Sequence, residues 1–377
     1  MIRVCYPFIG DRLGGSAISA KTMIRALPRD RVEPVVVLST ADGILAPFLA
    51  DLDVPVETLP LPPGVLARDR SALGNVAALA AYTRAALRFL RAHRIDVVHV
   101  QDREEFKSWW LAARLAGLPF VKHQRAPAVR GRYDRFVYRR CAAVVPVSDF
   151  IRSTLDGLGA PVCGTVYNPF AIRPREIDRA EARAAVLAEL GLPETARLVV
   201  VMARLTERKR QVLAVEALAR LPADPPVHLL LPGAGPDAEV WRPRIQARAA
   251  ELGLADRVHL LGQRADALRL TAASDVLAAP AVDEAFGRNT SEAVLLGTPV
   301  VASDSGGNPE LFTDGHNGLL FPPDDVEAFA GALGRVLFEP GLAEHLADTA
   351  LAEVGDRLSP ERHAEAILSI YRTVTQR

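Results

Sequence analysis

Residues 283–310 have the sequence DEAFGRNTSEAVLLGTPVVASDSGGNPE, and this stretch decides the class of fold. A helical segment, SEAVLLG, leads into a short apolar strand, PVVAS, and two adjacent glycines, Gly306 and Gly307, follow the strand. A uniformly apolar strand is typical of a sheet that is buried on both faces, and such sheets are parallel and connected by helices. The stretch therefore predicts one repeat of a parallel α/β sheet.

The same alternation of apolar run and helical pattern continues along the whole chain. It predicts an α/β protein of two Rossmann-like, doubly wound parallel-sheet domains that face a cleft. Strands are expected over 2–8, 33–39, 54–59, 96–100, 119–123, 143–148 and 163–168, and then over 197–203, 227–232, 257–262, 275–280, 299–303 and 318–321. In the second half, helices are expected over 208–220, 237–252, 265–273, 289–296 and 325–338.

A charged segment interrupted by prolines, residues 168–183, separates the two halves, as is typical of a linker. The last stretch, SPERHAEAILSIYRTV, begins with a Ser-Pro helix start and is amphipathic. No strand follows it, so it must dock on a part of the protein that already exists. We therefore expect domains over 1–168 and 169–355, and a helix within 356–377 that packs back on the first domain.

Composition limits the kind of protein. The 377 residues are long enough for two or three domains, and Lys+Arg and Asp+Glu both number 45, which argues against a nucleic-acid-binding protein. The three cysteines are scattered, so we expect a reducing compartment and neither a disulfide framework nor a zinc site. The N-terminus lacks the layout of a signal peptide, and no apolar run approaches the roughly 20 residues of a membrane span. These features predict a cytoplasmic enzyme.

Two glutamates, Glu284 and Glu292, flank a helix start. Each alone is more typical of a solvated loop acid or a partner of the helix dipole. Together with Gly287 they suggest more, because free amides at a helix start bind anions, and a carboxylate beside an anion must face hydroxyl groups. Sugar and ribose hydroxyls fit that requirement. The helix start that would supply these amides consists of Phe286, Gly287, Arg288 and Asn289.

Two cations, Arg204 and Lys209, follow the strand 197–203. A pair of surface cations is the commoner explanation of such residues. At the ligand-binding end of a sheet, however, they could neutralise a departing diphosphate in place of a divalent metal. The one DxD motif, at Asp51 and Asp53, precedes a strand instead of following one, and no histidine cluster has metal-ligand spacing, so we predict no metal.

Gly233, Gly235 and Ala238 form a weak G-x-G-x-x-A fingerprint after a strand. A nicotinamide site also needs an acid at the end of the following strand, where this chain has Gln263 and Arg264. The motif therefore favours a glycine turn close to a nucleotide over a dehydrogenase site.

In the first half, Gly14 and Gly15 precede a helix, and they fit a plain turn as well as a close approach to a ligand. His123 closes the strand 119–123 at the ligand-binding end and is a candidate for polar chemistry, although a structural role is an alternative. His99 lies inside its strand and is expected to be a packed core histidine.

Residues 125–140 carry six arginines and one aspartate. Such a run is usually a solvated helix face. Its place after His123 also suits an anionic acceptor or an acidic membrane surface. The acceptor-binding candidates are Arg125, Arg130 and Arg132.

These residues resemble the retaining, GT-B-fold glycosyltransferases of family 4 over essentially the whole chain. Glu284 and Glu292 match the family's E-x7-E signature, with its GTPVVA strand and GG-x-x-E turn, and ARLTERK matches its diphosphate-binding Arg/Lys motif. GLPFVKHQR matches the strand that ends in the first-domain histidine. RRCAAVVPVSDFIRSTL and VYNPF match the segments that lead into the second domain. The terminal helix fits the family's habit of crossing back onto the first domain.

The resemblance implies that Arg204 and Lys209 hold the donor diphosphate, that Glu284 binds sugar hydroxyls, and that Glu292 accepts from the ribose. His123 would lie near the reacting centre and, with the first three, forms the catalytic set. The other donor-binding candidates are Gly14, Gly15, Gly233, Arg264, Phe286, Gly287, Arg288 and Asn289.

The chain departs from the family pattern at Ala285, where glycine is common, and at Gln101, where a second histidine is frequent. The first change narrows the sugar pocket, and the second affects acceptor contacts. The resemblance implies retention of anomeric configuration without a metal. No carboxylate is placed as a nucleophile, so we expect front-face attack.

The resulting prediction is a hexosyltransferase that moves a sugar from a nucleoside-diphosphate sugar to a hydroxyl acceptor in glycan, lipopolysaccharide or glycosylated-metabolite biosynthesis. A UDP-sugar is favoured, then GDP-mannose. Whether the acceptor is anionic or lipid-linked, whether the protein touches the inner membrane face, and its oligomeric state stay open. Alternatives are a nucleotide-sugar isomerase or hydrolase of the same fold and a non-catalytic binding protein, against which Arg204 and Lys209 argue.

Overall fold

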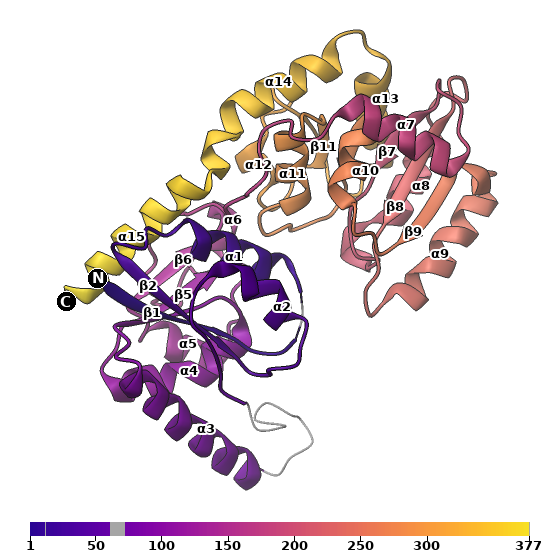
Figure 1. Ribbon diagram of the computed structural model, residues 1–377. Coiled ribbons are helices and arrows are strands. Elements are labelled where there is room, and N and C mark those ends of the chain that lie inside the picture. Colours follow the sequence, from indigo (N-terminus) through magenta and orange to yellow (C-terminus); the bar gives the residue numbers. More distant parts are fainter. Residues whose placement is uncertain (12, 61–71, 377) are drawn as a thin grey trace. The chain divides into compact units, whose positions relative to one another are not determined.

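The computed structural model describes residues 1–11, 13–60 and 72–376 and divides into two compact units (Figure 1). The first unit comprises Met1–Phe170 with Ser359–Arg377, and the second comprises Ala171–Leu358. The predicted domain boundaries lie within three residues of these divisions. Within the described residues, each unit holds one six-stranded sheet whose strand pairs are all parallel, which confirms the predicted fold class.

The sheet of the first unit has the strand order β3-β2-β1-β4-β5-β6. Its strands are β1 (Ile2–Phe8), β2 (Val32–Leu38), β3 (Val56–Thr58), β4 (Val97–Val100), β5 (Phe120–Gln124) and β6 (Ala143–Pro146). Its helices are α1 (Gly15–Ala26), α2 (Leu45–Leu49), η1 (Ala50–Leu52), α3 (Ala72–Ala92), α4 (Arg103–Ala116), α5 (Arg132–Tyr138), α6 (Asp149–Ser153) and α15 (Pro360–Thr375).

The sheet of the second unit has the order β12-β11-β10-β7-β8-β9. Its strands are β7 (Arg197–Val200), β8 (Val227–Pro232), β9 (Val258–Gly262), β10 (Val276–Ala279), β11 (Val300–Ser303) and β12 (Leu319–Phe321). Its helices are α7 (Arg179–Leu190), η2 (Glu207–Lys209), α8 (Gln211–Leu218), α9 (Ala238–Glu251), η3 (Ala255–Arg257), α10 (Ala267–Ala273), α11 (Arg288–Leu296), α12 (Asn308–Leu311), α13 (Val326–Phe338), α14 (Leu342–Val354) and η4 (Asp356–Leu358).

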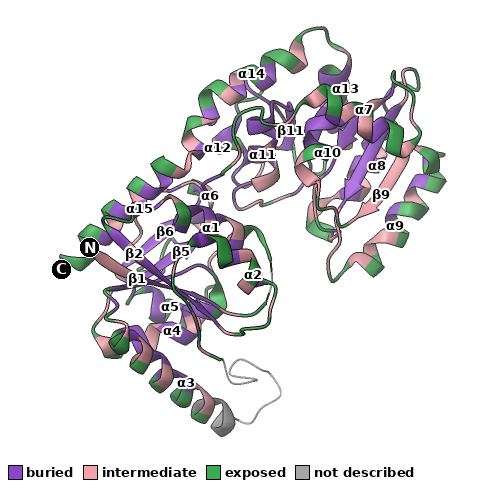
Figure 2. Cartoon of the chain, in the orientation of Figure 1, coloured by how far each residue is buried: buried purple, intermediate pink, exposed green. Residues whose placement is uncertain are grey.

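The central strands are buried on both faces, as their uniformly apolar sequences predict (Figure 2). Along β1, Val4 and Tyr6 point into one hydrophobic cluster, and Cys5 between them belongs to the cluster on the other face. This alternation follows from the two-residue period of a strand. Because helices cover both faces, the polar groups of the sheet are accessible mainly at the strand ends.

The C-terminal helix α15 completes the first unit. Ser359 caps its start through a hydrogen bond from the Arg362 amide (3.2 Å), as the Ser-Pro signal predicts. Its buried face contributes Ile367 to the core beside α1 and β1, and the Tyr371 hydroxyl lies 2.6 Å from the Tyr6 hydroxyl. The helix therefore supplies part of the first unit's core.

The expected elements differ from the structure at two places. Residues 163–168 form no strand: the amides of Cys163 and Val166 each donate to a carbonyl of β6 at 2.9 Å, but the one bridge to β6 is at Val162, just before them. The charged end of the predicted linker forms α7, which Asp178 caps by accepting hydrogen bonds from the amides of Ala180 and Glu181. Part of the predicted linker is therefore the start of a helix.

Candidate active site

The strand order of the second sheet reverses between β7 and β10, which pair directly through Val199 with Val276 and Val200 with Leu277. Open parallel sheets bind ligands outside such a reversal, at the carboxyl ends of the strands. The segment after β7 carries Arg204 and Lys209, and the segment after β10 carries Glu284. The topology thus brings together residues that lie about 75 positions apart in the sequence.

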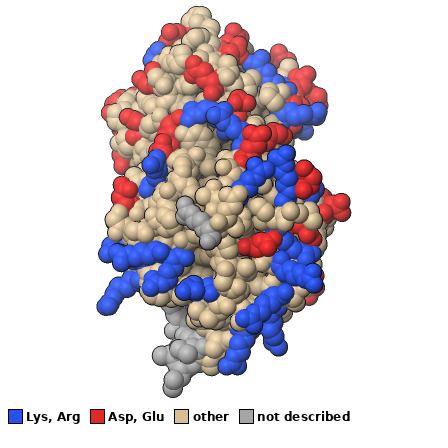
Figure 3. Space-filling model, turned by 90° about the vertical axis from the view of Figure 1, so that its left-hand side faces the viewer, with Lys and Arg blue, Asp and Glu red and all other residues tan. Residues whose placement is uncertain are grey.

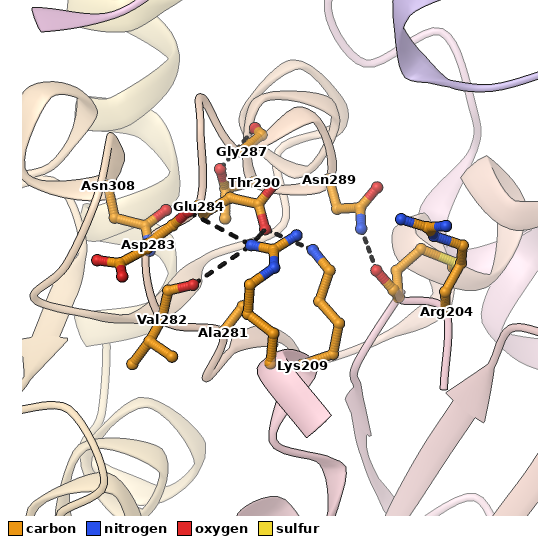
Figure 4. A network of polar contacts seen from close by, with 12 residues as sticks. Arg204, Lys209, Ala281, Val282, Asp283, Glu284, Gly287, Asn289, Thr290 and Asn308 are labelled. Atoms are coloured by element: carbon orange, nitrogen blue, oxygen red, sulfur yellow. Dashed lines mark hydrogen bonds and ion pairs between the residues drawn. The ribbon is translucent and has the colours of Figure 1, made fainter. Parts of the chain in front are cut away.

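Glu284 lies at the centre of an ion cluster in which one carboxylate oxygen, Oε2, accepts from two cations (Figure 4). The Lys209 ammonium donates to Oε2, and the Arg208 guanidinium donates to the same oxygen at 3.2 Å. The Lys209 and Glu284 side chains are only 14% and 21% exposed. A two-cation site around one acid leaves a net positive charge at the end of β7.

The protonation state of Glu284 follows from this cluster. Burial alone raises the pKa of the carboxyl, but the charges and hydrogen bonds of Lys209 and Arg208 outweigh burial and hold the pKa below its ordinary value. The carboxylate is therefore ionised near neutral pH and acts only as an acceptor. Hydroxyl groups are suitable donors for its second oxygen.

Arg204 lies at the solvent-exposed end of β7. Its carbonyl accepts from Gln211 Nε2 at 2.8 Å, and within the described residues its guanidinium makes no ion pair. The glycine turn after β8 packs against it: a Cβ on Gly235 would touch the Arg204 side chain at 3.5 Å, and one on Gly233 would lie 1.8 Å from the Ala203 carbonyl oxygen. These glycines allow the β8 turn to approach the segment that carries Arg204.

Helix α11 begins beside the cluster with no side-chain cap. Its N-cap, Gly287, has φ +83°, and a Cβ there would lie 2.4 Å from Thr290 Oγ1. The side-chain amide of Asn289 donates to the backbone carbonyl of Met202, and this hydrogen bond connects the helix start to the segment after β7 (Figure 4). A helix start without a side-chain cap, placed at the sheet reversal, is a common type of anion site.

Glu292 lies one turn further along α11. Its carboxylate accepts from the Arg288 guanidinium at 2.9 Å, four residues earlier on the same helix. Burial raises its pKa, although Arg288 opposes the shift. Unlike Glu284, this acid is held by a neighbour in its own helix.

Gly306 and Gly307 support the Glu284 loop from behind. The Gly307 amide donates to the Glu284 carbonyl at 2.8 Å. A Cβ on Gly306, whose φ is +64°, would lie 2.4 Å from that same carbonyl oxygen. The glycine pair is needed here for close packing of backbone on backbone.

Arg264 is held by two carboxylates. Its guanidinium donates to Glu189 on α7 and to Asp266 at 2.5–3.0 Å, through Nε and both terminal nitrogens. These hydrogen bonds raise the pKa of Arg264 further and lower that of Glu189. Arg264 therefore links the β9–α10 loop to α7. None of these hydrogen bonds involves Lys209 or Glu284.

In the first unit the strand order reverses between β1 and β4. Gly14 is the uncapped N-cap of α1, Gly15 is its first residue, and both are exposed with open space around Gly14. Beside the reversal, the buried Glu105 accepts from the amides of Ile9 (2.9 Å) and Asp102 (2.7 Å). Burial and the nearby Asp102 raise the pKa of Glu105 above its ordinary value, and its two oxygens, each accepting a backbone amide, join the two strand ends.

His123 is fully buried and stands in a column of three stacked imidazoles. Its ring lies 5.5 Å from those of His99 and His363, with interplanar angles of 2° and 5°. Burial holds the pKa of all three histidines below the ordinary value, to about 3 for His363, and the charge of Arg125 adds to the shift. The column is therefore neutral, and His99 is a packed core histidine, as predicted.

The three arginines predicted to bind an acceptor differ in their surroundings. Arg125 is half-buried and donates to Gln101 at 3.0 Å and to Asn168. Arg130 and Arg132 are exposed, and Arg130 donates to the Thr154 carbonyl at 3.2 Å. Arg125 thus organises the ends of β4 and β5, while the other two face solvent.

Sequence analysis did not single out Arg208 or His363. Arg208 stands beside Lys209, but its partner Glu284 is 76 residues away, and no local pattern reports that contact. His363 lies on an amphipathic helix, where its spacing is typical of a core position. Among residues 1–11, 13–60 and 72–376, no group of three or more His, Cys, Asp or Glu side chains is arranged to hold a metal ion.

Comparison with known proteins agrees with this geometry. Residues 183–352 match the family described as glycosyl transferases group 1, and residues 14–171 match the glycosyl transferase 4-like domain. The chain is 30% identical to a D-inositol 3-phosphate glycosyltransferase of Xylanimonas cellulosilytica over 98% of this chain and 94% of that protein. It is 33% identical to the lipopolysaccharide core biosynthesis glycosyltransferase LpsE of Rhizobium meliloti over 48% of this chain and 52% of that one.

Solved structures share the fold. Anabaena HepE, solved with UDP and glucose, superimposes with a TM-score of 0.84 at 24% identity over 99% of this chain and all of that one. The lipopolysaccharide outer core galactosyltransferase WaaB gives a TM-score of 0.75 at 17% identity, with 99% of both chains covered. At these identities the likeness establishes the arrangement of the backbone.

Proposed function

The chain belongs to the GT-B glycosyltransferases of family 4 type, and from this premise we propose that it transfers a hexose from a nucleoside-diphosphate sugar to a hydroxyl acceptor. One observation carries the proposal: Arg204, Lys209 and the start of α11, which no side chain caps, lie at the sheet reversal of the second unit, where Lys209 contacts the ionised Glu284 (Figure 4). Cations and a helix start suit a diphosphate, and the acid suits sugar hydroxyls.

In this proposal the leaving diphosphate is stabilised by Arg204, Lys209 and the first amides of α11. Fixed donors aimed at developing charge contribute about 3–4 kcal/mol each to lowering a barrier. Glu284 orients the sugar through its hydroxyls, so that the acceptor oxygen approaches the face from which the diphosphate departs. This route retains the anomeric configuration and uses protein cations where other transferases use a metal.

A UDP-sugar is the proposed donor. HepE has been solved with UDP and with UDP-glucose, and it covers the whole of this chain. The relatives named for D-inositol 3-phosphate and for lipopolysaccharide core support an acceptor that carries anionic groups beside its hydroxyls. The exposed Arg130 and Arg132 could meet such an acceptor.

The experiment incubates the protein with UDP-, GDP-, ADP- and TDP-sugars, with and without polyol phosphate acceptors, in the presence of EDTA. We expect UDP release that needs both a UDP-sugar and an acceptor, with the anomeric configuration kept in the product by NMR. Release without an acceptor would show a hydrolase, and a changed sugar without release would show an isomerase. Loss of activity in EDTA that Mg²⁺ restores would refute metal independence.

A surface of the first unit supports a further part of the proposal, which is peripheral contact with an anionic membrane. Tyr133 and Phe136 on α5 are 41% and 42% exposed, and both contact Trp110 on α4. The Arg140 guanidinium lies 3.6 Å from the Phe136 ring centre. Lys and Arg predominate on the face of this unit seen in Figure 3. Exposed aromatic rings beside an arginine, on a basic face (Figure 3), suit a headgroup layer.

Vesicle sedimentation tests this contact. We expect the protein to bind phosphatidylglycerol-containing vesicles more tightly than phosphatidylcholine vesicles, and Phe136→Ala with Tyr133→Ala to weaken binding. Val240→Ala, which removes an exposed apolar side chain from the second unit, is the control. Equal sedimentation of both variants would rule out this surface. Among the described residues no helix is long and apolar enough to cross a membrane.

A further inference from the structure

Arg208 is a second basic residue that reaches the Glu284 loop, and neither the sequence motifs nor the proposed function gives it a role. It lies on η2 directly before Lys209, and its side chain is 44% exposed. From there one terminal nitrogen, Nη1, donates to the carbonyl oxygens of Val282 (3.3 Å) and Asp283 (3.4 Å) as well as to Glu284 Oε2 (3.2 Å). The side chain thus spans from the end of β7 to the loop after β10.

The two cations on Glu284 are held differently. Lys209 makes a single contact to the carboxylate, through an ammonium that is a compact point charge on a flexible stem. Arg208 contacts the carboxylate and two backbone carbonyls with a planar group. Of the two, Lys209 is the one that can exchange its partner without releasing the loop.

A diphosphate at the start of α11 would compete with Glu284 for Lys209. A carboxylate that is mostly buried is destabilised when its cation leaves, because little solvent reaches it to compensate for the lost charge. Arg208 would then be the remaining cation on Glu284. Its two carbonyl contacts would hold the loop in place during the exchange.

We propose that Arg208 is a positioning residue of the transferase: it holds Glu284 and its loop in place when Lys209 turns to the donor diphosphate. The inference rests on the proposed function, because it assigns the diphosphate to Lys209 and the sugar hydroxyls to Glu284. It separates the two tasks of the cluster. Lys209 binds the phosphate half of the donor, and Arg208 acts on the sugar half through Glu284.

Arg210 offers a matched control on the same short segment. It lies two residues from Arg208, and its guanidinium forms an ion pair with Asp324 at 2.7 Å instead of contacting the Glu284 loop. Arg208→Ala and Arg210→Ala remove the same side chain and the same charge. Any difference between the variants therefore reports the contacts of Arg208 with Glu284 and its loop.

The experiment measures the Kd for free UDP by calorimetry, and kcat and KM for the UDP-sugar, in wild type, Arg208→Ala, Arg208→Lys and Arg210→Ala. For Arg208→Ala we expect UDP affinity within about twofold of wild type and a fall of about tenfold in kcat/KM for the donor sugar, the effect of losing one charged hydrogen bond. Arg208→Lys should recover part of that loss. Arg210→Ala should match wild type in both measurements.

The pH profile gives a readout that a merely structural role would not move. Arg208 is one of the groups that lower the pKa of Glu284, so its removal should raise that pKa and shift the acid limb of kcat/KM to higher pH. Thermal unfolding checks that all variants are folded. Equal kcat/KM and equal profiles for Arg208→Ala and Arg210→Ala would overturn the inference. A wild type that neither binds UDP nor transfers sugar would instead refute the proposed function.

Discussion

The two units share one topology but differ in what they place at the point where the strand order reverses. In the second unit the reversal holds ionised groups near solvent, Lys209 and Glu284, beside an exposed Arg204. In the first unit it holds the buried Glu105 and Lys122, close to a column of neutral histidines. The same backbone plan thus produces one partly exposed ion cluster and one site whose polar groups are buried.

Burial explains the difference. The segments after β7 and β10 keep their cations partly hydrated and in reach of a carboxylate, so charge persists. In the first unit α15 packs over the sheet with His363 and Tyr371, which leaves the polar groups there in a dry environment. The second reversal therefore keeps its charged side chains within reach of solvent, while the polar groups at the first reversal are buried.

The largest expected effect comes from removing the two cations that follow β7. Arg204→Ala with Lys209→Ala should lower kcat by at least about 1,000-fold, because each cation is a donor to the departing diphosphate worth roughly 10²–10³ in rate. Rates of UDP release in the presence of acceptor measure this. Arg210→Ala with Arg220→Ala removes two cations from the same unit as a control. Full turnover in the Arg204/Lys209 double variant would place the diphosphate elsewhere.

A second prediction tests the backbone beneath that site. Gly306→Ala puts a methyl group 2.4 Å from the Glu284 carbonyl oxygen, so the loop must move, and kcat/KM for the donor should fall about tenfold or more. Gly315 also has a positive φ (+74°) but open space around it. Gly315→Ala therefore shares the conformational strain of about 1–2 kcal/mol without the clash. If both variants lost activity equally, strain alone would be the cause.

A third prediction concerns the buried histidine column of the first unit. The three column histidines have a lower pKa in the folded protein than in the unfolded chain. Their contribution to the free energy of unfolding is therefore complete above the unfolded pKa of about 6.5 and is lost as the pH falls below it. Wild type should therefore lose stability between pH 7 and pH 5. His363→Gln should lose about 2 kcal/mol less over that range, since one protonation is removed from the linkage.

Urea unfolding followed by tryptophan fluorescence measures this, because Trp109 and Trp110 lie on α4 in the first unit. His345→Gln, at an exposed position on α14, is the control and should keep the wild-type pH dependence. A wild-type stability that does not change between pH 7 and pH 5 would show that the column accepts protons without penalty.

Much of this comparison follows from the sequence. Apolar runs predicted both parallel sheets, because a strand that is buried on both faces has apolar residues at successive positions and does not alternate between apolar and polar ones. The cations and the acid placed after the strands indicated Arg204, Lys209 and Glu284 as candidates for one site, and the sheet reversal brings Lys209 and Glu284 into contact. Residues 163–168 were predicted as a strand, but they make only two backbone hydrogen bonds to β6 and no ladder beyond an isolated bridge at Val162.

The partners of charged side chains could not be predicted in this way. Arg208 depends on a contact with a residue 76 positions away, and the histidine column depends on the stacking of His363 on His123, which is 240 positions away, so a local pattern encodes neither. Arg264 shows the limit most clearly. Its place after β9 suggested contact with the donor, and nothing in the neighbouring sequence reveals that Glu189 on α7 takes two of its hydrogen bonds.

The smallest expected effect concerns Arg264 and tests whether its side chain is a structural link to α7 or contacts the donor. Its guanidinium is bound by two carboxylates, so Arg264→Ala should lower stability by no more than about 1 kcal/mol, the range of partly exposed ion pairs, and leave the Kd for UDP within about twofold. Glu189→Ala should cause a similar loss of stability, because both variants break the same link between α7 and the β9–α10 loop. Calorimetry with UDP and GDP tests the alternative. If Arg264→Ala weakened UDP binding more than fivefold while Glu189→Ala did not, Arg264 would exchange its carboxylate partners for the nucleotide, and the charged site would extend from the sheet reversal to the edge strand.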